Sequence, residues 1–487
     1  MLFNSTPFIF FFIVLVGVYF ALPYRLRWIW LLGSSYYFYM TWEATNLLII
    51  VLTTMIAYFT GVQMGKTELK SERKRFLIFS LLSNFGILFL FKYYNFFNDS
   101  LKATFEYHNL SYGVSSFAPI LPVGISFYIF KSLSYTIDVY RGEKTPERHL
   151  GIFALYVSFF PQLLAGPIER ATRLLPQFHK KFDFDYQRVT NGLKLMLWGL
   201  FQKMVIADNL ATLVDSVYNH PYQYEGLALA MATFFYAFQI FCDFSGYSDI
   251  AIGVAQILGF TTMENFRRPY FAQSIPEFWR RWHISLSTWF RDYLYIPLGG
   301  NRVSLPKWYF NLFIVLLICG LWHGANWTFI VWGGLHGIYL VFSVLTQNIR
   351  KEIHQAIGLD KLPRLHRFLK VITTFSFVCF AWIFFRANTI SDALYIVSNV
   401  LTGWPDLFRL ELWRSIPMWG PLKFEFIIGT ASIGVLIWKH LMERRGNIVE
   451  MFSEKPIWIR WPIYYSVILS ILLFGHFGKK QFIYFQF

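Results

Sequence analysis

FWRRWHISLSTWFRDYLYIPLGGNR, residues 278–302, and CGLWHGANW, residues 319–327, stand on either side of a short polar link and an apolar run. The two pieces carry His283 and His323, forty positions apart. The first piece is rich in arginine and aromatic residues, and the apolar run carries the second histidine into a segment hydrophobic enough to enter a membrane. This pattern indicates a polar reaction centre held inside a lipid-embedded protein.

The composition places the whole chain in the membrane class. Of its 487 residues, 55% are hydrophobic and 15% are charged, whereas soluble proteins carry about 25% charged residues. Apolar runs of roughly 17 residues or more, long enough as helices to cross a hydrocarbon core of about 30 Å, recur along the chain. We therefore predict an all-α polytopic protein with one integral membrane domain over residues 1–487. The first run, 7–22, lacks a basic leader and a small-residue cleavage site, so it should remain as a span.

The net charge of +16 reflects topology rather than nucleic-acid binding, because the basic residues lie in loops between apolar runs and not on one face of a soluble module. Lys and Arg accumulate on the cytoplasmic side of membrane proteins. Loops 23–27, 65–76, 140–149, 169–188, 261–307, 347–370 and 439–460 hold 33 of the 44 basic residues, and the alternate segments hold seven. This asymmetry predicts that both termini are extracytoplasmic.

Twelve runs are candidate spans: 7–22, 28–42, 46–64, 76–94, 118–138, 189–210, 226–260, 308–325, 327–346, 366–385, 424–441 and 461–476. Run 150–168 has basic loops on both sides, so we expect a re-entrant hairpin there. Run 226–260 is long and contains CDFSGYSD at 242–249, which predicts a break in its helix. Irregular backbone at membrane depth occurs only inside protein or beside water, so both segments predict an interior polar cavity.

Segment 261–307 is too aromatic for a flexible linker and should form short amphipathic helices at the cytoplasmic interface. It carries four forked, permanently charged donors suited to the phosphates of a nucleotide-like donor such as an acyl-coenzyme A: Arg280, Arg281, Arg291 and Arg302. Positive-inside bias and contact with anionic lipid explain part of this set equally well. PLGGNR at 297–302 lacks the residues of a phosphate-binding loop, so we interpret it as a tight turn.

The histidines are the candidate catalytic residues. An ionisable group in a membrane span is a functional hypothesis, and a neutral imidazole at His323 could take a proton from a hydroxyl. A helix-end histidine bonded to a neighbour is the alternative. His283 could orient the acyl carbonyl or assist His323, or it could instead bind phosphate or lipid headgroups. Small neighbours Gly320 and Gly324 would let a substrate chain approach, and glycines beside His336 indicate close helix packing.

The sequence indicates no metal site and no tightly bound cofactor. The three cysteines lie in apolar runs without CxxC spacing, so we interpret them as packing residues. The pairs Asp243/Asp249 and Asp208/Asp215 have no His or Glu at ligand spacing, so structural hydrogen bonding is the favoured role.

The tail FGKKQFIYFQF, residues 477–487, ends the chain on aromatic residues. It could form an interfacial aromatic belt, fold back into the protein, or dock to a partner. Tyr484 carries the one hydroxyl among the last ten residues. Because the tail is predicted to be extracytoplasmic, we hypothesise that Tyr484 is a transient acyl carrier.

Several motifs together resemble the membrane-bound O-acyltransferase (MBOAT) family, in the bacterial branch that O-acetylates surface polysaccharides such as alginate. They are LPVGISFYIFKSLSYTIDVYRG (121–142), FFPQLLAGPIER (159–170), QIFCDFSGYSDIAIG (239–253), the opening stretch 278–302, LWHGANWTFIVWGGLHG (321–337) and the closing FIYFQF. The resemblance implies a ring of about 11–12 transmembrane helices around a central tunnel in the bacterial inner membrane. It also maps the family's invariant histidine to His323 and a more variable polar position to His283.

The resemblance implies a function as well: an acyl group, acetyl in this branch, passes from a cytoplasmic acetyl-CoA or acyl-carrier donor to an extracytoplasmic polysaccharide. A separate SGNH-type esterase-like partner would complete the transfer, because the chain carries no GxSxG motif of its own. D-alanyl transfer to teichoic acid and peptidoglycan O-acetylation are alternatives by the same mechanism. A transporter or flippase and a non-catalytic scaffold are alternatives of another class.

Overall fold

The computed structural model describes residues 1–117, 121–164, 166–402, 422–444, 446, 451, 454–477 and 482–483. Every regular element in this part of the chain is a helix. Contacts divide the chain into two compact units, the first formed by Met1–Leu193 with Ala251–Met263 and the second by Lys194–Ile250 with Glu264–Phe487. The single domain over residues 1–487 stays a prediction.

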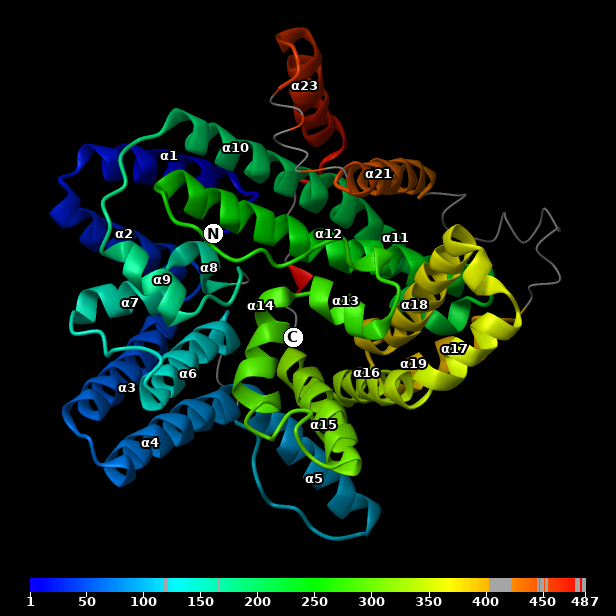
Figure 1. Cartoon of the computed structure of the whole chain (residues 1–487), viewed down its shortest axis with the longest axis horizontal. Coiled ribbons are helices and arrows are strands. Elements are labelled where there is room, and N and C mark those ends of the chain that lie inside the picture. Colours follow the sequence, from blue (N-terminus) through cyan, green and yellow to red (C-terminus); the bar gives the residue numbers. More distant parts are fainter. Residues whose placement is uncertain are drawn as a thin grey trace. The chain divides into compact units, whose positions relative to one another are not determined.

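The first unit is built on three mutually packed helices, α3, α4 and α6, with α2 lying against α7 and α7 against α9 (Figure 1). Its helix α1 begins with a proline in the first turn, where the missing N–H costs no hydrogen bond. The elements are α1 Thr6–Ala21, α2 Tyr24–Met40, α3 Asn46–Lys66, α4 Lys70–Leu88, η1 Phe89–Tyr93, α5 Tyr94–Tyr107, α6 Ile125–Arg141, α7 Leu150–Ser158, α8 Phe160–Leu163, α9 Ala171–Phe178 and the start of α10 Tyr186–Leu200.

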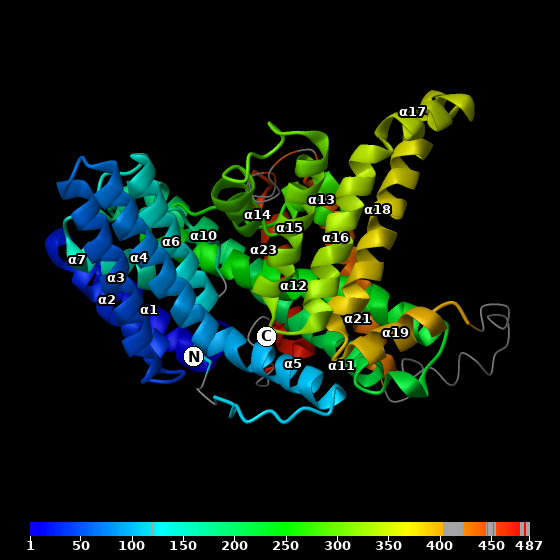
Figure 2. The same ribbon diagram turned by 90° about the horizontal axis from the view of Figure 1, so that it is seen from below.

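The second unit contains the stretch with which the sequence analysis began. In it α15 and α16 form a closely packed pair, and α18 lies along the other side of α16 (Figure 2). The elements are η2 Phe201–Ala207, α11 Asp208–Tyr218, η3 Pro221–Gln223, α12 Leu227–Leu258, η4 Pro269–Phe271, α13 Ile275–Arg281, α14 Ile284–Phe290, η5 Arg291–Tyr295, α15 Leu305–His323, α16 Trp327–Leu345, α17 Gln347–Ala356, η6 Leu359–Lys361, α18 Pro363–Arg386, α19 Ile390–Asn399, α21 Lys423–Met442 and α23 Ile457–Phe474. Helix α12 runs from this unit into the first.

Among the described residues, eight helical segments are long and apolar enough to cross a membrane, which confirms an all-α polytopic protein. Eight of the twelve predicted runs coincide with them. The other four fall on shorter helices: α1 with 16 residues, α2 and α6 with 17 each, and α10 with 15. The eight segments are Asn46–Lys66, Lys70–Tyr107, Leu227–Leu258, Leu305–His323, Trp327–Leu345, Pro363–Arg386, Lys423–Met442 and Ile457–Phe474.

The predicted break in run 226–260 is wrong, because α12 is continuous from Leu227 to Leu258. The polar residues of CDFSGYSD are satisfied by a neighbouring element instead of by unwinding. Ser245 donates to Gln202 Oε1 at 2.5 Å, and Gln202 Nε2 donates to Asp249 at 2.7 Å. Gly246 lets η2 and α10 approach closely, since a Cβ there would lie 2.7 Å from the carbonyl oxygen of Gly199.

Run 150–168 contains two short helices, α7 and α8. The nine residues of α7 rise only about 14 Å, so this run is not a single crossing helix. The re-entrant hairpin stays a prediction. Segment 261–307 forms short helices, as predicted: η4, α13, α14 and η5. The PLGG turn is confirmed too, because Gly299 and Gly300 both have positive φ, at 101° and 56°.

Candidate active site

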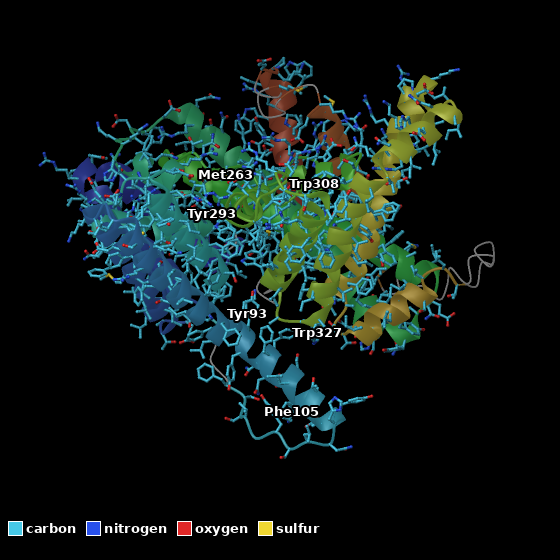
Figure 3. All side chains as sticks on the ribbon, turned by 60° about the horizontal axis from the view of Figure 1, so that its bottom comes forward. Tyr93, Phe105, Met263, Tyr293, Trp308 and Trp327 are labelled. Atoms are coloured by element: carbon cyan, nitrogen blue, oxygen red, sulfur yellow. The ribbon has the colours of Figure 1, made fainter. Side chains whose placement is uncertain are left out.

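His323 is the last residue of α15, the helix that packs most closely on α16. Trp308 near the start of α15 and Trp327 at the start of α16 mark opposite ends of this pair (Figure 3). The expectation that the neighbouring glycines leave room for a substrate is wrong, because both are packed against α16. A Cβ on Gly320 would lie 2.3 Å from the Phe329 carbonyl oxygen, and one on Gly324 would lie 2.2 Å from the Phe329 ring. These glycines let α16 approach and so fix the place of His323.

His283 lies between α13 and α14 with its backbone in the left-handed region, at φ 43°. Such a conformation is uncommon outside glycine and costs on the order of 1–3 kcal/mol, so it persists where neighbours impose it. Asn265 is the neighbour that does so. Its carbonyl accepts from Ile284 N at 2.9 Å, and its side-chain oxygen accepts from Ser285 Oγ at 2.9 Å.

The structure brings the two predicted histidines together. Their ring centroids are 6.3 Å apart, and the side chains are almost wholly buried, with 0% of His283 and 3% of His323 exposed. Trp322 contacts both rings, at 5.0 Å from His323 and 6.0 Å from His283. Burial lowers the pKa of His283 well below its ordinary value, because an imidazolium is poorly solvated there. A neutral imidazole suits the removal of a proton from a hydroxyl.

Aromatic rings enclose the pair. Phe244 meets His283 edge-on at 4.5 Å, and Trp332 and Phe385 lie 5.1 and 5.4 Å from His323. His336 is fully buried, and its ring lies 5.1 Å from that of Trp332, which also contacts His323. Such an enclosure limits the access of water to the two imidazoles.

The C-terminal tail returns to this enclosure. Phe482 is fully buried, stacks on Tyr247 at 4.8 Å and lies 5.6 Å from Phe244, the ring that contacts His283. The backbone N–H of Ile483 donates to Asp243 Oδ2 at 2.7 Å. The sequence left open an interfacial belt, a return into the protein and docking to a partner. Phe482 and Ile483 return into the protein. Tyr484 and residues 478–481 and 485–487 lie outside the described residues.

A buried ion cluster, which the sequence analysis missed, holds the carboxylate under the tail. Lys203 Nζ lies 2.5 Å from Asp243 Oδ1 and 2.9 Å from Asp208 Oδ1. The available signal was Lys203, one of two lysines in the apolar run 189–210, since a charge at membrane depth needs a partner. Asp215 pairs with Arg386 at 2.6 Å. These aspartates therefore have structural partners, and no group of three metal-binding side chains is found in the described part of the chain.

The four arginines of segment 261–307 have different surroundings. Arg281 forms an ion pair with Glu277 at 2.5 Å, and Arg291 pairs with Asp292 at 2.8 Å. Arg280 and Arg302 are exposed. Their binding to donor phosphates stays a prediction.

Long apolar helices and a buried, closely spaced histidine pair in an aromatic enclosure define an integral membrane protein with a candidate active site inside it. Residues 31–385 match the membrane-bound O-acyltransferase family. The chain belongs to this family, and it is an O-acyltransferase. The transporter and scaffold alternatives are therefore set aside.

Three relatives show the degree of similarity. The probable alginate O-acetylase AlgI of Azotobacter vinelandii is 41% identical over 85% of this chain and 81% of its own length. The protein of the same name in Pseudomonas aeruginosa is 42% identical over 81% and 73%. A peptidoglycan O-acetyltransferase of Helicobacter pylori is 35% identical over 77% and 73%.

Proposed function

We propose that this enzyme moves an acetyl group from a cytoplasmic thioester, acetyl-CoA or an acyl carrier, across the membrane for O-acetylation of an extracytoplasmic polysaccharide. The observation that carries the proposal is the buried pair of His323 and His283, whose ring centroids are 6.3 Å apart. The names of the A. vinelandii and P. aeruginosa relatives supply the acceptor class, an alginate-like polymer.

In the proposed reaction His323 is the general base. Its neutral imidazole takes the proton from the attacking hydroxyl as the oxygen bonds to the thioester carbonyl carbon. The carbon–sulfur bond then breaks, and the thiolate leaves with a proton returned by the imidazolium. His283 assists as a second polar group beside the reacting carbonyl. The aromatic rings around the pair keep water from competing as the nucleophile.

We further propose that the first acceptor is the phenolic oxygen of Tyr484. Transfer to this oxygen would form an acetyl-tyrosine ester, which an extracytoplasmic SGNH-type partner would then attack through its own nucleophile, leaving the phenol free. What supports this assignment is the neighbouring backbone: Ile483 is bonded to Asp243, and Phe482 packs on Phe244, which touches His283.

Acetyl-CoA turnover by the purified, reconstituted protein tests His323. His323→Gln should lower turnover by about 10²–10⁴-fold, the range typical of a lost general base. His220→Gln is the matched control, since His220 is exposed and lies before η3. Unchanged turnover in His323→Gln would remove this residue from the reaction while leaving the family assignment intact.

Intact-mass measurement after incubation with acetyl-CoA tests Tyr484. The wild type should gain one acetyl group and Tyr484→Phe should gain none, with polymer acetylation lost in cells. Full polymer acetylation by Tyr484→Phe, with no adduct in the wild type, would contradict the carrier role.

Peptidoglycan O-acetylation is a second candidate, favoured by the H. pylori relative. Mass spectrometry of the surface polymers of cells with and without the gene separates the two. Loss of acetyl from the exopolysaccharide alone supports the first proposal, and loss from the glycan strands of the wall supports the second.

A further inference from the structure

A cavity of about 230 Å³ lies in the first unit and is lined in part by residues of α2, α7 and α9. These three helices are neighbours in the fold (Figure 1). Its floor is apolar and its rim is basic. The floor consists of five buried residues, Leu31, Ile152, Leu155, Phe178 and Phe260. The rim carries five basic residues, Arg25, Arg27, His149, His179 and Lys180.

The rim is held in place by specific contacts. The guanidinium of Arg27 donates to the carbonyl oxygens of Leu22 at 3.1 Å and Phe182 at 2.6 Å, which ties the α1–α2 turn to the segment after α9. His149 Nδ1 accepts from Ile152 N at 3.2 Å. In the neutral ring the proton therefore lies on Nε2, which makes that nitrogen a donor.

The wall of the cavity depends on one close approach. Gly151 in α7 lies against the indole of Trp28, and a Cβ there would meet the ring at 2.2 Å. The edge of the same indole meets the His149 ring at 4.7 Å. The aromatic wall and the basic rim are therefore parts of one packed arrangement.

Charge makes the cavity a site for an anion. Among the described residues that line it, none is Asp or Glu. The nearby carboxylate of Glu147 is already engaged, because it accepts from the His149 backbone N–H at 3.0 Å and contacts His179 Nε2 at 3.0 Å. The remaining guanidinium, ammonium and imidazole donors suit a phosphate.

The surroundings identify the kind of anion. The rim comes from loops 23–27, 140–149 and 169–188, three separate segments that the distribution of basic residues predicts to be cytoplasmic. Beside it Leu26 and Ile29 are 46% and 49% exposed, as expected of side chains that face lipid. Basic pockets between transmembrane helices on this side suit acidic headgroups. We propose that this cavity binds the phosphate headgroup of an anionic phospholipid of the cytoplasmic leaflet, with the acyl chains along Leu26 and Ile29.

The test uses the full-length protein in nanodiscs of phosphatidylcholine with a minor fraction of phosphatidylglycerol. Native mass spectrometry counts the phosphatidylglycerol retained after extraction. The variant is Arg25→Gln with Lys180→Gln, both exposed rim residues. The matched control is Arg148→Gln with Lys181→Gln, which removes the same charge from adjacent residues outside the cavity lining.

The rim variant should retain at least about tenfold less phosphatidylglycerol, since each basic residue near the surface favours acidic lipid several-fold. The control should retain the wild-type amount, and thermal unfolding should be unchanged in both. If both variants lose the same amount of phosphatidylglycerol, general surface charge explains the binding and the proposal is overturned. Displacement of the lipid by added coenzyme A, with weaker coenzyme A binding in the rim variant, would overturn it in favour of a nucleotide-phosphate site.

Discussion

His283 combines a buried imidazole with a left-handed backbone, and the two properties can be separated by substitution. Asparagine adopts this conformation more readily than most residues, so His283→Asn should keep the turn between α13 and α14 while removing the ring. We expect acetyl-CoA turnover to fall at least about tenfold, with a small shift in the unfolding temperature.

His283→Val is the comparison for the backbone, because a β-branched residue is strongly disfavoured at positive φ. It should lower both turnover and thermal stability. Full turnover in His283→Asn would show that the position serves the fold and not the reaction.

The sequence singled out both histidines of the candidate site. His323 is an ionisable residue among apolar neighbours, and His283 follows Arg280 and Arg281 at the polar position that the family resemblance indicates. It did not predict that Lys203 would lie against Asp208 and Asp243. Asp243 follows Lys203 by forty positions, and nothing local to either residue specifies the other. When the partner of a buried charge lies far away in the sequence, the pair can be recognised only from the packed helices.

At the level of elements, the close approach of α15 and α16 depends on glycine. A Cβ on Gly333 would lie 2.4 Å from the backbone oxygen of Leu316, so Gly333→Ala must separate the helices. Overpacking costs about 1–3 kcal/mol, and the separation also moves His323 relative to Trp332. We expect lower thermal stability and lower acetyl-CoA turnover.

Gly334→Ala is the matched control, since a Cβ there meets only Leu317 Cδ1, at an ordinary 3.6 Å. It should behave as wild type in both measurements. Equal effects of the two substitutions would contradict a role for this helix contact in placing His323.

Helix α12 shows why element boundaries were harder to predict than element types. The polar run at 242–249 predicts an interruption of the helix, yet Ser245 and Asp249 are hydrogen-bonded to Gln202 of η2. The penalty for polar groups at membrane depth is removed by a neighbouring side chain as effectively as by water. Composition alone does not show whether polar groups in a helix bond to water at a break or to a side chain of a neighbouring helix.

At the scale of the whole molecule, the placement of loops by charge is open to direct test. The helical segment Lys70–Tyr107 is continuous over 38 residues, about 57 Å, so it exceeds a core of about 30 Å. Its ends should therefore lie on opposite sides of the membrane.

An impermeant maleimide applied to spheroplasts should label His108→Cys and spare Glu68→Cys, both exposed positions. Permeabilised cells, in which both should react, are the control. The reverse pattern would invert the predicted topology.

Residues 482 and 483 contact a helix about 240 positions earlier in the chain, and the bond from Ile483 to Asp243 fixes this contact. Phe482 supplies the packing for this return, because its ring is fully buried against Tyr247 and Phe244. Phe482→Ala should cost about 3–5 kcal/mol if the cavity stays open, and it should lower acetyl-CoA turnover by releasing the tail from Phe244, the ring that contacts His283.

Phe477→Ala removes the same ring at a site that is 63% exposed, so it should change neither the unfolding temperature nor turnover. The comparison with Tyr484→Phe then separates two roles of one tail. We expect Phe482→Ala to lose both stability and turnover, and Tyr484→Phe to lose turnover alone. This result would show that Phe482 holds the tail in place and that Tyr484 takes part in the reaction. Wild-type turnover in Phe482→Ala would mean that the buried tail is packing for the second unit and takes no part in the transfer.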